Sequence, residues 1–285
     1  MTLSPGVLLG IVAMLGYGLA DFFVERATRD ADVFDTVLWS KAVSAGLIGA
    51  VVVARRPSLS MGRDSALLIA AAGLLAVAAY LAFYHGIQVG KLSIVSPVAS
   101  GWGAVSAIVG VAVLGQVLSG VQAAAVATVV AGTVLASFRR HDLAGLQWRN
   151  YEVGIEYGAV SLLAWGVSFA IVDVAVGRVG WLPSIAGLLT VVLAAMLGYG
   201  LVSDRSLSPP DALRSILLIG VFEAVAYVAL GVGLVDFDAA LVAPVAAAFP
   251  VVTVVLARLF LDEPLDGNQW LGIAGIVAGV VLLSV

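Results

Sequence analysis

Ten long apolar runs constrain this chain more strongly than any other feature of its sequence. They occur near residues 5–25, 33–54, 65–86, 92–114, 119–138, 153–176, 182–202, 213–234, 239–261 and 268–285. An α-helix needs ~20 apolar residues to cross a hydrocarbon layer ~30 Å thick. Backbone groups in hydrocarbon must pair within the chain, and these runs lack the alternation of apolar and polar residues that barrel strands show. The sequence therefore predicts an all-α integral membrane protein with ten transmembrane helices.

Composition excludes several other classes of protein. The chain is 62% hydrophobic and 11% charged, whereas soluble domains are ~45–50% apolar and ~25% charged. The net charge of −4 argues against a nucleic-acid partner, and the absence of cysteine excludes disulfides and thiolate nucleophiles. No phosphate-binding loop or zinc-protease motif occurs, so we expect no cofactor and no metal. The expected partners are the lipid bilayer and a small-molecule substrate.

The sequence also repeats itself. Residues 94–137 match residues 241–284 at a constant offset of 147. The first apolar run matches the sixth at an offset of 148. Paired positions include Pro97 with Pro244, Trp102 with Phe249, Tyr80 with Tyr227, Tyr17 with Trp165, and Glu25 with Asp173. We therefore expect two five-helix repeats at residues 1–138 and 153–285, joined by a polar linker at 139–152.

An odd number of helices in each repeat has a consequence for topology. The second half must cross the membrane in the sense opposite to the first. Inverted repeats of this kind are common in transporters, where the substrate site lies near the midplane between the halves.

A family resemblance follows from the last two apolar runs. They contain Ala-Pro at 243–244, Phe-Pro at 249–250, Leu-x-Glu-x-Leu at 261–265 and Gln-Trp-x-Gly at 269–272. This pattern resembles EamA-type proteins of the drug/metabolite transporter superfamily, and the first half resembles it more weakly. The resemblance implies a ten-helix bundle with a central cavity and secondary transport of a metabolite. Many relatives carry a basic residue where this chain has Glu25, so the resemblance does not imply an anionic substrate for this chain.

Glu223 is the strongest candidate for a functional residue. It lies within the eighth apolar run with apolar residues on both sides. An ionisable group near the bilayer centre costs at least ~2.5–3.5 kcal/mol on insertion scales, so it is a functional candidate by default. We expect Glu223 to line the central cavity and to exchange a proton, and Glu223→Gln to fold normally but transport poorly. A structural acid bonded to a neighbouring helix is the alternative.

Other candidates share helix faces with one another or with Glu223. The expected residues for substrate binding or proton coupling are Glu223, Tyr227, Tyr80, Tyr17, Asp21, Trp165, Trp102 and Phe249. Glu25 and Asp173 lie near the ends of equivalent helices and are expected at opposite entrances of the pathway. A solvated interfacial role is the alternative for the acids, and simple packing is the alternative for the aromatic residues. Lys41, inside the second run, is expected to pair with an acid.

Three prolines and a row of glycines predict where helices bend and where they pack closely. Pro97, Pro244 and Pro250 lie inside apolar runs, where each removes a backbone donor and favours a kink. Such kinks would suit bending between inward-open and outward-open states, although a static kink fits equally. Gly272, Gly275 and Gly279 form a smooth face for close helix packing.

The function that these features favour is secondary transport by alternating access. The excess of intramembrane acid and the nearby aromatic residues favour a cationic, zwitterionic or aromatic solute, with protons as a possible coupling ion. A membrane-embedded enzyme and a non-transporting sensor remain alternatives. The resemblance implies a multi-pass protein of the cell membrane with cytoplasmic termini. That topology leaves four basic residues inside and nine outside, contrary to the positive-inside rule. The oligomeric state stays open.

Overall fold

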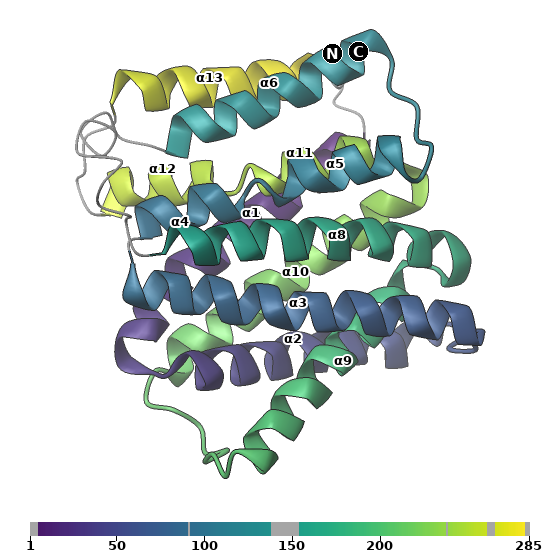
Figure 1. Ribbon diagram of the computed structural model, residues 1–285, viewed down its shortest axis with the longest axis vertical. Helices are drawn as coiled ribbons and strands as arrows, with labels where there is room; N and C mark the ends of the chain where they lie inside the picture. Colours follow the sequence, from purple (N-terminus) through teal and green to yellow (C-terminus); the bar gives the residue numbers. More distant parts are fainter. Residues whose placement is uncertain (1–4, 91, 138–153, 238, 261–265, 283–285) are drawn as a thin grey trace.

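The computed structural model describes residues 5–90, 92–137, 154–237, 239–260 and 266–282, and all regular structure within them is helical (Figure 1). The first half contains α1 (Pro5–Asp30), α2 (Val33–Arg55), α3 (Arg63–Val89), α4 (Leu92–Ala99), α5 (Trp102–Ala112) and α6 (Gly120–Ser137). The second half contains α8 (Ile155–Val179), α9 (Trp181–Val202), α10 (Leu213–Asp236), α11 (Ala239–Ala247), α12 (Pro250–Phe260) and α13 (Gly267–Leu282).

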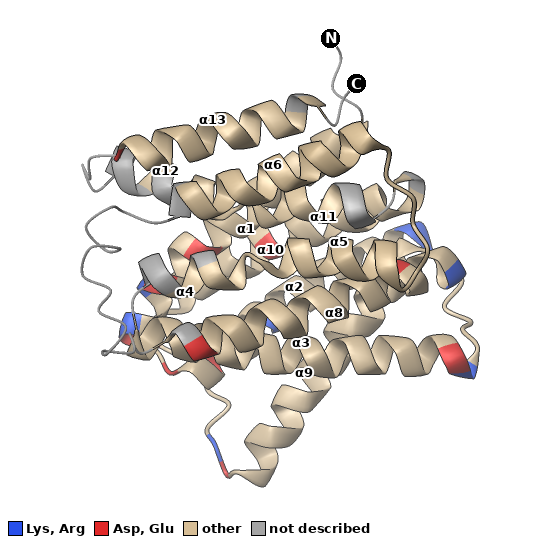
Figure 2. Ribbon diagram, turned by 45° about the horizontal axis from the view of Figure 1, so that its top comes forward, with Lys and Arg blue, Asp and Glu red and all other residues tan. Residues whose placement is uncertain are grey.

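Six of these helices are long and apolar enough to cross a membrane: α1, α2, α3, α8, α9 and α10. The remaining apolar helices are shorter. Figure 2 shows that charged residues lie mostly at the two ends of the bundle, and that few lie in its middle. This distribution is the one that a hydrocarbon layer around the bundle requires, because charged groups are stable at its two aqueous faces.

The apolar runs at 92–114 and 239–261 each form two helices instead of one. α4 and α5 are separated at residues 100–101, and α11 and α12 are separated at residues 248–249. The backbone stays hydrogen-bonded through both breaks, since Gly101 donates to Val98 O (3.1 Å) and Ala248 donates to Val245 O (3.2 Å). Pro250 occupies the first position of α12, where its missing N–H removes no helical hydrogen bond.

The other expected proline positions also fall on these discontinuous helices. Pro97 lies in α4, three residues before the break, and Pro244 lies inside α11. The helix breaks therefore lie beside the prolines, at residues 100–101 and 248–249, which sequence analysis did not predict.

Equivalent glycines of the two halves pack closely against the two helix breaks. Gly18 of α1 lies so near the break before α12 that a Cβ added there would stand 2.4 Å from Val252 Cβ. Gly166 of α8 makes the same contact with α5, where an added Cβ would stand 2.5 Å from Val105 Cβ. These four positions are repeat mates. A glycine of the neighbouring helix thus allows close contact with the backbone break in each half.

One long helix of each half also packs along a helix of the other half. α1 packs along α10, with Gly6 against Phe237 and Gly16 against Ala226, so the two helices are antiparallel. The equivalent pair is α3 with α8, which is antiparallel as well. In that pair, Ser161 Oγ donates to Ala79 O (3.1 Å) and Ser168 Oγ donates to Ala72 O (2.9 Å).

The pair formed by α6 and α13 lies at one edge of the bundle (Figure 1). Gly132 of α6 faces Gly272 O, and Gly279 of α13 faces Val129. The glycine face of the last helix therefore packs within the chain, as the sequence pattern predicted.

Two loops at one end of the bundle are joined by Asp32. Its Oδ1 accepts from the Phe34 N–H (2.7 Å) and so caps α2, and its Oδ2 pairs with Arg205 Nη1 (2.5 Å) from the loop after α9. Partial burial by itself would raise the pKa of the Asp32 carboxyl. The hydrogen bond from Phe34 and the pairing with Arg205 outweigh burial and hold that pKa below its usual value.

Alanine at Gly18 tests the packing at the helix break. We expect Gly18→Ala to lower the free energy of unfolding by about 1–3 kcal/mol, as overpacking of a well-packed core does. The matched control is Gly49→Ala in α2, where no atom lies within 4 Å of an added Cβ. Melting temperatures of the purified variants in detergent measure the difference. Equal melting temperatures for the two variants would show that the contact tolerates a methyl group.

Substitution of Asp32 tests the loop connection. Asp32→Ala should lower the free energy of unfolding by about 0.5–2 kcal/mol through loss of the N-cap. Asp32→Asn keeps the cap and should lose less, because an exposed ion pair contributes only about 0–1 kcal/mol. The folded pKa is depressed, so this stabilisation exists above the unfolded pKa and disappears as the pH falls through the folded pKa. Melting curves from pH 7 to pH 3 should therefore converge for the wild type and Asp32→Asn; a constant gap would contradict this account.

Candidate functional site

A cavity lies at the centre of the bundle, between helices of both halves. The space not filled by atoms there, its opening to solvent included, is about 400 Å³. Its lining contains most of the predicted site residues together with four others: Tyr17, Ala20, Asp21, Tyr80, Phe83, Tyr84, Trp102, Trp165, Phe169, Glu223 and Phe249. The structure therefore brings together side chains that are up to 232 positions apart in the sequence, from Tyr17 to Phe249.

The aromatic wall of the cavity follows from the two helix breaks. Trp102 is the first residue of α5, and Phe249 lies in the turn just before α12. Both side chains are buried, at 2% and 3% exposure. The ring of Tyr17 lies 6.4 Å from the ring of Trp102 and 6.3 Å from that of Phe249, between centroids. The breaks thus place one large ring from each half beside α1.

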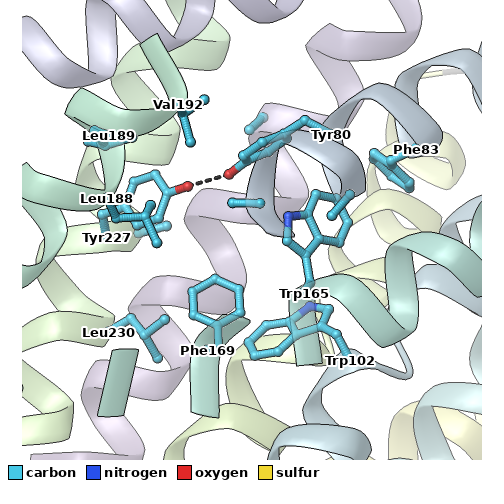
Figure 3. Close-up of a cluster of buried hydrophobic side chains, with 14 of the residues drawn as sticks. Tyr80, Phe83, Trp102, Trp165, Phe169, Leu188, Leu189, Val192, Tyr227 and Leu230 are labelled. Carbon is cyan, nitrogen blue, oxygen red and sulfur yellow. Dashed lines mark hydrogen bonds between the residues drawn. The ribbon is translucent and has the colours of Figure 1, made fainter. Parts of the chain in front are cut away.

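Trp165 and Phe169 of α8 complete this wall. The Trp102 and Phe169 rings lie 4.5 Å apart, and the Trp165 ring lies 5.2 Å from that of Tyr80. Figure 3 shows these rings from α3, α5 and α8 gathered around one space. Such a wall suits an apolar or aromatic solute, and its ring faces attract cations.

Tyr80 and Tyr227 occupy equivalent positions in the two repeats and meet between the halves. Their hydroxyl groups are hydrogen-bonded to each other, as the dashed line in Figure 3 marks. Both side chains are almost fully buried. Tyr80 lines the cavity, whereas Tyr227 lies behind it and touches the Tyr17 ring, with centroids 6.1 Å apart. Repeat mates thus contact each other directly.

Glu223 is not a lone carboxylate. Its Oε1 forms a buried ion pair with Lys41 Nζ of α2, and the Lys41 side chain is fully buried. Ser44 Oγ lies 3.3 Å from Glu223 Oε2, and Tyr84 donates to Oε1 at 3.5 Å. The expectation that Glu223→Gln would fold normally was based on an isolated acid, and this ion pair removes that basis. The sequence could not show the pairing because 182 positions separate the two residues.

The Lys41 ammonium also lies over an aromatic face. Its Nζ is 3.5 Å from the centroid of the Tyr80 ring and 5.9 Å from that of Tyr84. A buried ammonium is stable only when a counter-charge and further contacts replace its water, and here Glu223 and the two rings do so.

Asp21 is the second acid of the cavity. It is 8% exposed and its Oδ2 accepts from Ser96 Oγ at 3.5 Å. Within the described part of the chain it has no ion-pair partner. The cavity wall therefore holds two carboxylates and, beside them, one ammonium.

The charged groups break the correspondence between repeats that several of the aromatic residues follow. Gly220 packs on Ser40 O and Val43, just as Gly73 packs on Leu188 O and Val191, so α2 and α9 are equivalent. In this register each charged residue has an apolar mate. Lys41 corresponds to Leu189, Glu223 to Ala76, and Asp21 to Phe169. All three charges therefore lie on α1, α2 and α10, on one side of the cavity.

The two entrance candidates lie outside the cavity lining. Glu25 is partly exposed and pairs with Arg29 on its own helix (2.5 Å), at the end of the bundle where α1 terminates. Asp173 is partly buried near the end of α8 and accepts from Gln116 Nε2 (2.6 Å). Because α8 is antiparallel to α3 and α3 has the sense of α1, these ends are opposite. The gate role itself stays a prediction.

Sequence reasoning missed several residues of the site. Tyr84, Ser44 and Ser96 were not singled out, and Lys41 was expected only to pair with some acid. Tyr84 follows Tyr80 by one turn, which is the one signal that sequence offered. The serines gave none, because a serine in an apolar helix usually bonds to its own backbone.

Comparison with known proteins decides the family. The family model of the EamA-like transporter family matches residues 4–138 and again residues 153–285. The chain belongs to the EamA-like transporter family. The resemblance drawn from the sequence and the two-repeat architecture are thereby confirmed, and membership in a family of transporters argues against the enzyme alternative. A solved crystal structure with 18% identity superposes with a TM-score of 0.79, covering 99% of this chain and 96% of that chain, and it supports the fold alone. A search of curated proteins finds no match.

The buried ion pair of this EamA-family chain predicts a strong coupling between two substitutions. Lys41→Met or Glu223→Gln alone should lower the free energy of unfolding by about 3–5 kcal/mol, because each leaves an uncompensated buried charge. The double variant should recover most of that loss. A double-mutant cycle on melting temperature or denaturant midpoint measures the coupling. Additive effects of the two substitutions would show that the pair is not formed.

Proposed function

We propose that this protein is a secondary transporter that moves a small organic solute across the cell membrane by alternating access. The observation that carries the proposal is the central cavity, which is walled by rings from both repeats and holds two carboxylates beside one lysine. A cavity at the boundary of two repeats is where transporters of this plan bind their substrates.

The proposal includes ten crossings in two inverted repeats. Six helices are long enough to span a membrane singly. The pairs α4 with α5 and α11 with α12 supply one broken crossing each, and α6 and α13 supply the remaining two. The antiparallel packing of α1 on α10 and of α3 on α8 supports opposite insertion of the halves.

The charge balance of the cavity supports a solute that carries a positive charge. Lys41 compensates Glu223, and Asp21 leaves one formal negative charge over. The aromatic wall suits an apolar or aromatic body. A cationic or zwitterionic solute with such a body fits both features.

Proton coupling is part of the proposal, and Asp21 is better suited to it than Glu223. A coupling carboxylate must bind proton and solute in turn. Glu223 already has three protein partners, whereas Asp21 has one hydrogen bond, from Ser96.

We also propose that both termini are cytoplasmic, in keeping with the family. The start of α1 and the end of α13 lie toward the same side of the bundle in Figure 1. A C-terminal reporter that is active only in the cytoplasm should give a signal. Silence of a well-expressed fusion would reverse the orientation.

Transport into liposomes tests the proposed function. Purified protein should accelerate the uptake of members of a panel of small amines, zwitterions and neutral aromatic solutes, and an imposed pH gradient should change the rate. Trp165→Leu should weaken apparent affinity about 5- to 30-fold, since a desolvated cation–π contact contributes about 1–2 kcal/mol. The control is Trp270→Leu on α13, whose side chain is 60% exposed and outside the cavity lining. Folded protein that transports nothing from the panel would contradict the proposal.

A further inference from the structure

We propose that Asp21, and not Glu223, is the carboxylate that binds the positive group of the solute, and that Lys41 is a tethered cation that limits the cavity to one external positive charge. This inference rests on the proposed function. It assigns separate roles to the two acids and names the substrate class as small organic monocations with an apolar or aromatic body.

Glu223 has little capacity left for a solute. One carboxylate oxygen is taken by the Lys41 ammonium and the Tyr84 hydroxyl, and the other faces the Ser44 hydroxyl. A solute cation would have to displace Lys41, which is fully buried and ion-paired with Glu223. Displacement would leave an uncompensated charge inside the bundle.

Lys41 also occupies the aromatic face beside Glu223. With Nζ 3.5 Å from the Tyr80 centroid, the lysine holds the place that a solute cation would take on that ring. The protein's own ammonium therefore fills a complete cation site, with a carboxylate and a ring face.

Asp21 has a similar setting but no ion-pair partner among the described residues. It shares the cavity with the rings of Tyr17, Trp102, Phe169 and Phe249. Its carboxylate has no ion-pair partner within the described residues, and its one hydrogen bond, from Ser96, leaves acceptor positions open. A carboxylate, ring faces and open acceptor positions are what binding of an organic ammonium needs.

A second observation concerns Tyr17, which lines the same cavity. The hydroxyl of Tyr17, one turn before Asp21 on the same face of α1, is buried and has no hydrogen-bond partner among the described residues. A buried hydroxyl left unpaired is costly, so such a group in a cavity wall is available to a ligand. Tyr17 and Asp21 together offer one hydroxyl and one carboxylate to a bound solute.

The asymmetry of the cavity limits the number of such sites. The repeat mate of Asp21 is Phe169, and the mates of Lys41 and Glu223 are Leu189 and Ala76. The opposite wall therefore offers ring faces but no second carboxylate. One external positive charge balances the site, and two would leave an excess.

Calorimetry in lipid nanodiscs with three probes of one shape tests the role of Asp21. The probes are benzylamine, its neutral analogue benzyl alcohol, and the dication p-xylylenediamine. The wild type should bind benzylamine at least about 10-fold more tightly than either of the others, a difference of about 1.4 kcal/mol. Asp21→Asn should remove the preference for benzylamine over benzyl alcohol. Retention of that preference in folded Asp21→Asn would overturn the assignment.

Removal of the tethered cation tests Lys41. Lys41→Met frees Glu223 and should reverse the preference, so that p-xylylenediamine binds more tightly than benzylamine. Lys41→Met/Glu223→Gln removes both charges and should restore the preference for benzylamine, and it keeps the test decisive if the single variant fails to fold. A folded double variant without a preference for benzylamine would show that the pair itself binds the solute, and would overturn the proposal.

The transport function and the role of Asp21 can be disproved separately. Binding that follows the predicted charge preferences without any transport in liposomes would remove the proposed function and leave the assignment of Asp21. Transport that is indifferent to the charge of the solute, and unchanged by Asp21→Asn, would leave the transporter and remove the cation site.

Discussion

Close packing between helices of different halves is the constraint from which the other features of this structure follow. α1 lies against α10 and the break before α12, and α8 lies against α3 and the break before α5, through glycine, alanine and serine. In a bilayer, apolar side chains gain little by leaving lipid for protein, so helices associate where small residues allow close contact and hydrogen bonding. The resulting interlock fixes the position of both breaks, and the breaks fix Trp102 and Phe249 in the cavity.

Symmetry and asymmetry have separate roles in the site. Several rings follow the repeat, since Tyr80 meets Tyr227, and Trp102 and Phe249 both contact Tyr17. The charges do not, because the positions equivalent to Lys41, Glu223 and Asp21 in the other repeat are apolar. A symmetric scaffold suits two equivalent open states, whereas a substrate with a charged end and an apolar end needs walls that differ.

Individual residues show how far sequence reasoning extends into the site. The sequence identified Glu223 and Asp21 because a charge inside an apolar run is conspicuous, and it identified Trp102 and Phe249 because they are repeat mates. It misread Glu223 as isolated, since helix pairing between α2 and α10 is not encoded in any local pattern. It predicted bends at Pro97, Pro244 and Pro250. The structure has its helix breaks at residues 100–101, after Pro97, and at residues 248–249, between Pro244 and Pro250.

The sequence by itself determined the class of the protein, the approximate helices, the two repeats and the family, because hydropathy and repetition are properties of the chain read in order. Tertiary structure alone decided which acid is neutralised, which hydroxyl is left unpaired, and which side of the cavity is charged. The physical reason is distance: an ion pair such as Lys41 with Glu223 acts over a few ångströms between residues 182 positions apart. Only the packing of α2 on α10 brings those two charges together, and it leaves Asp21 without an ion-pair partner among the described residues.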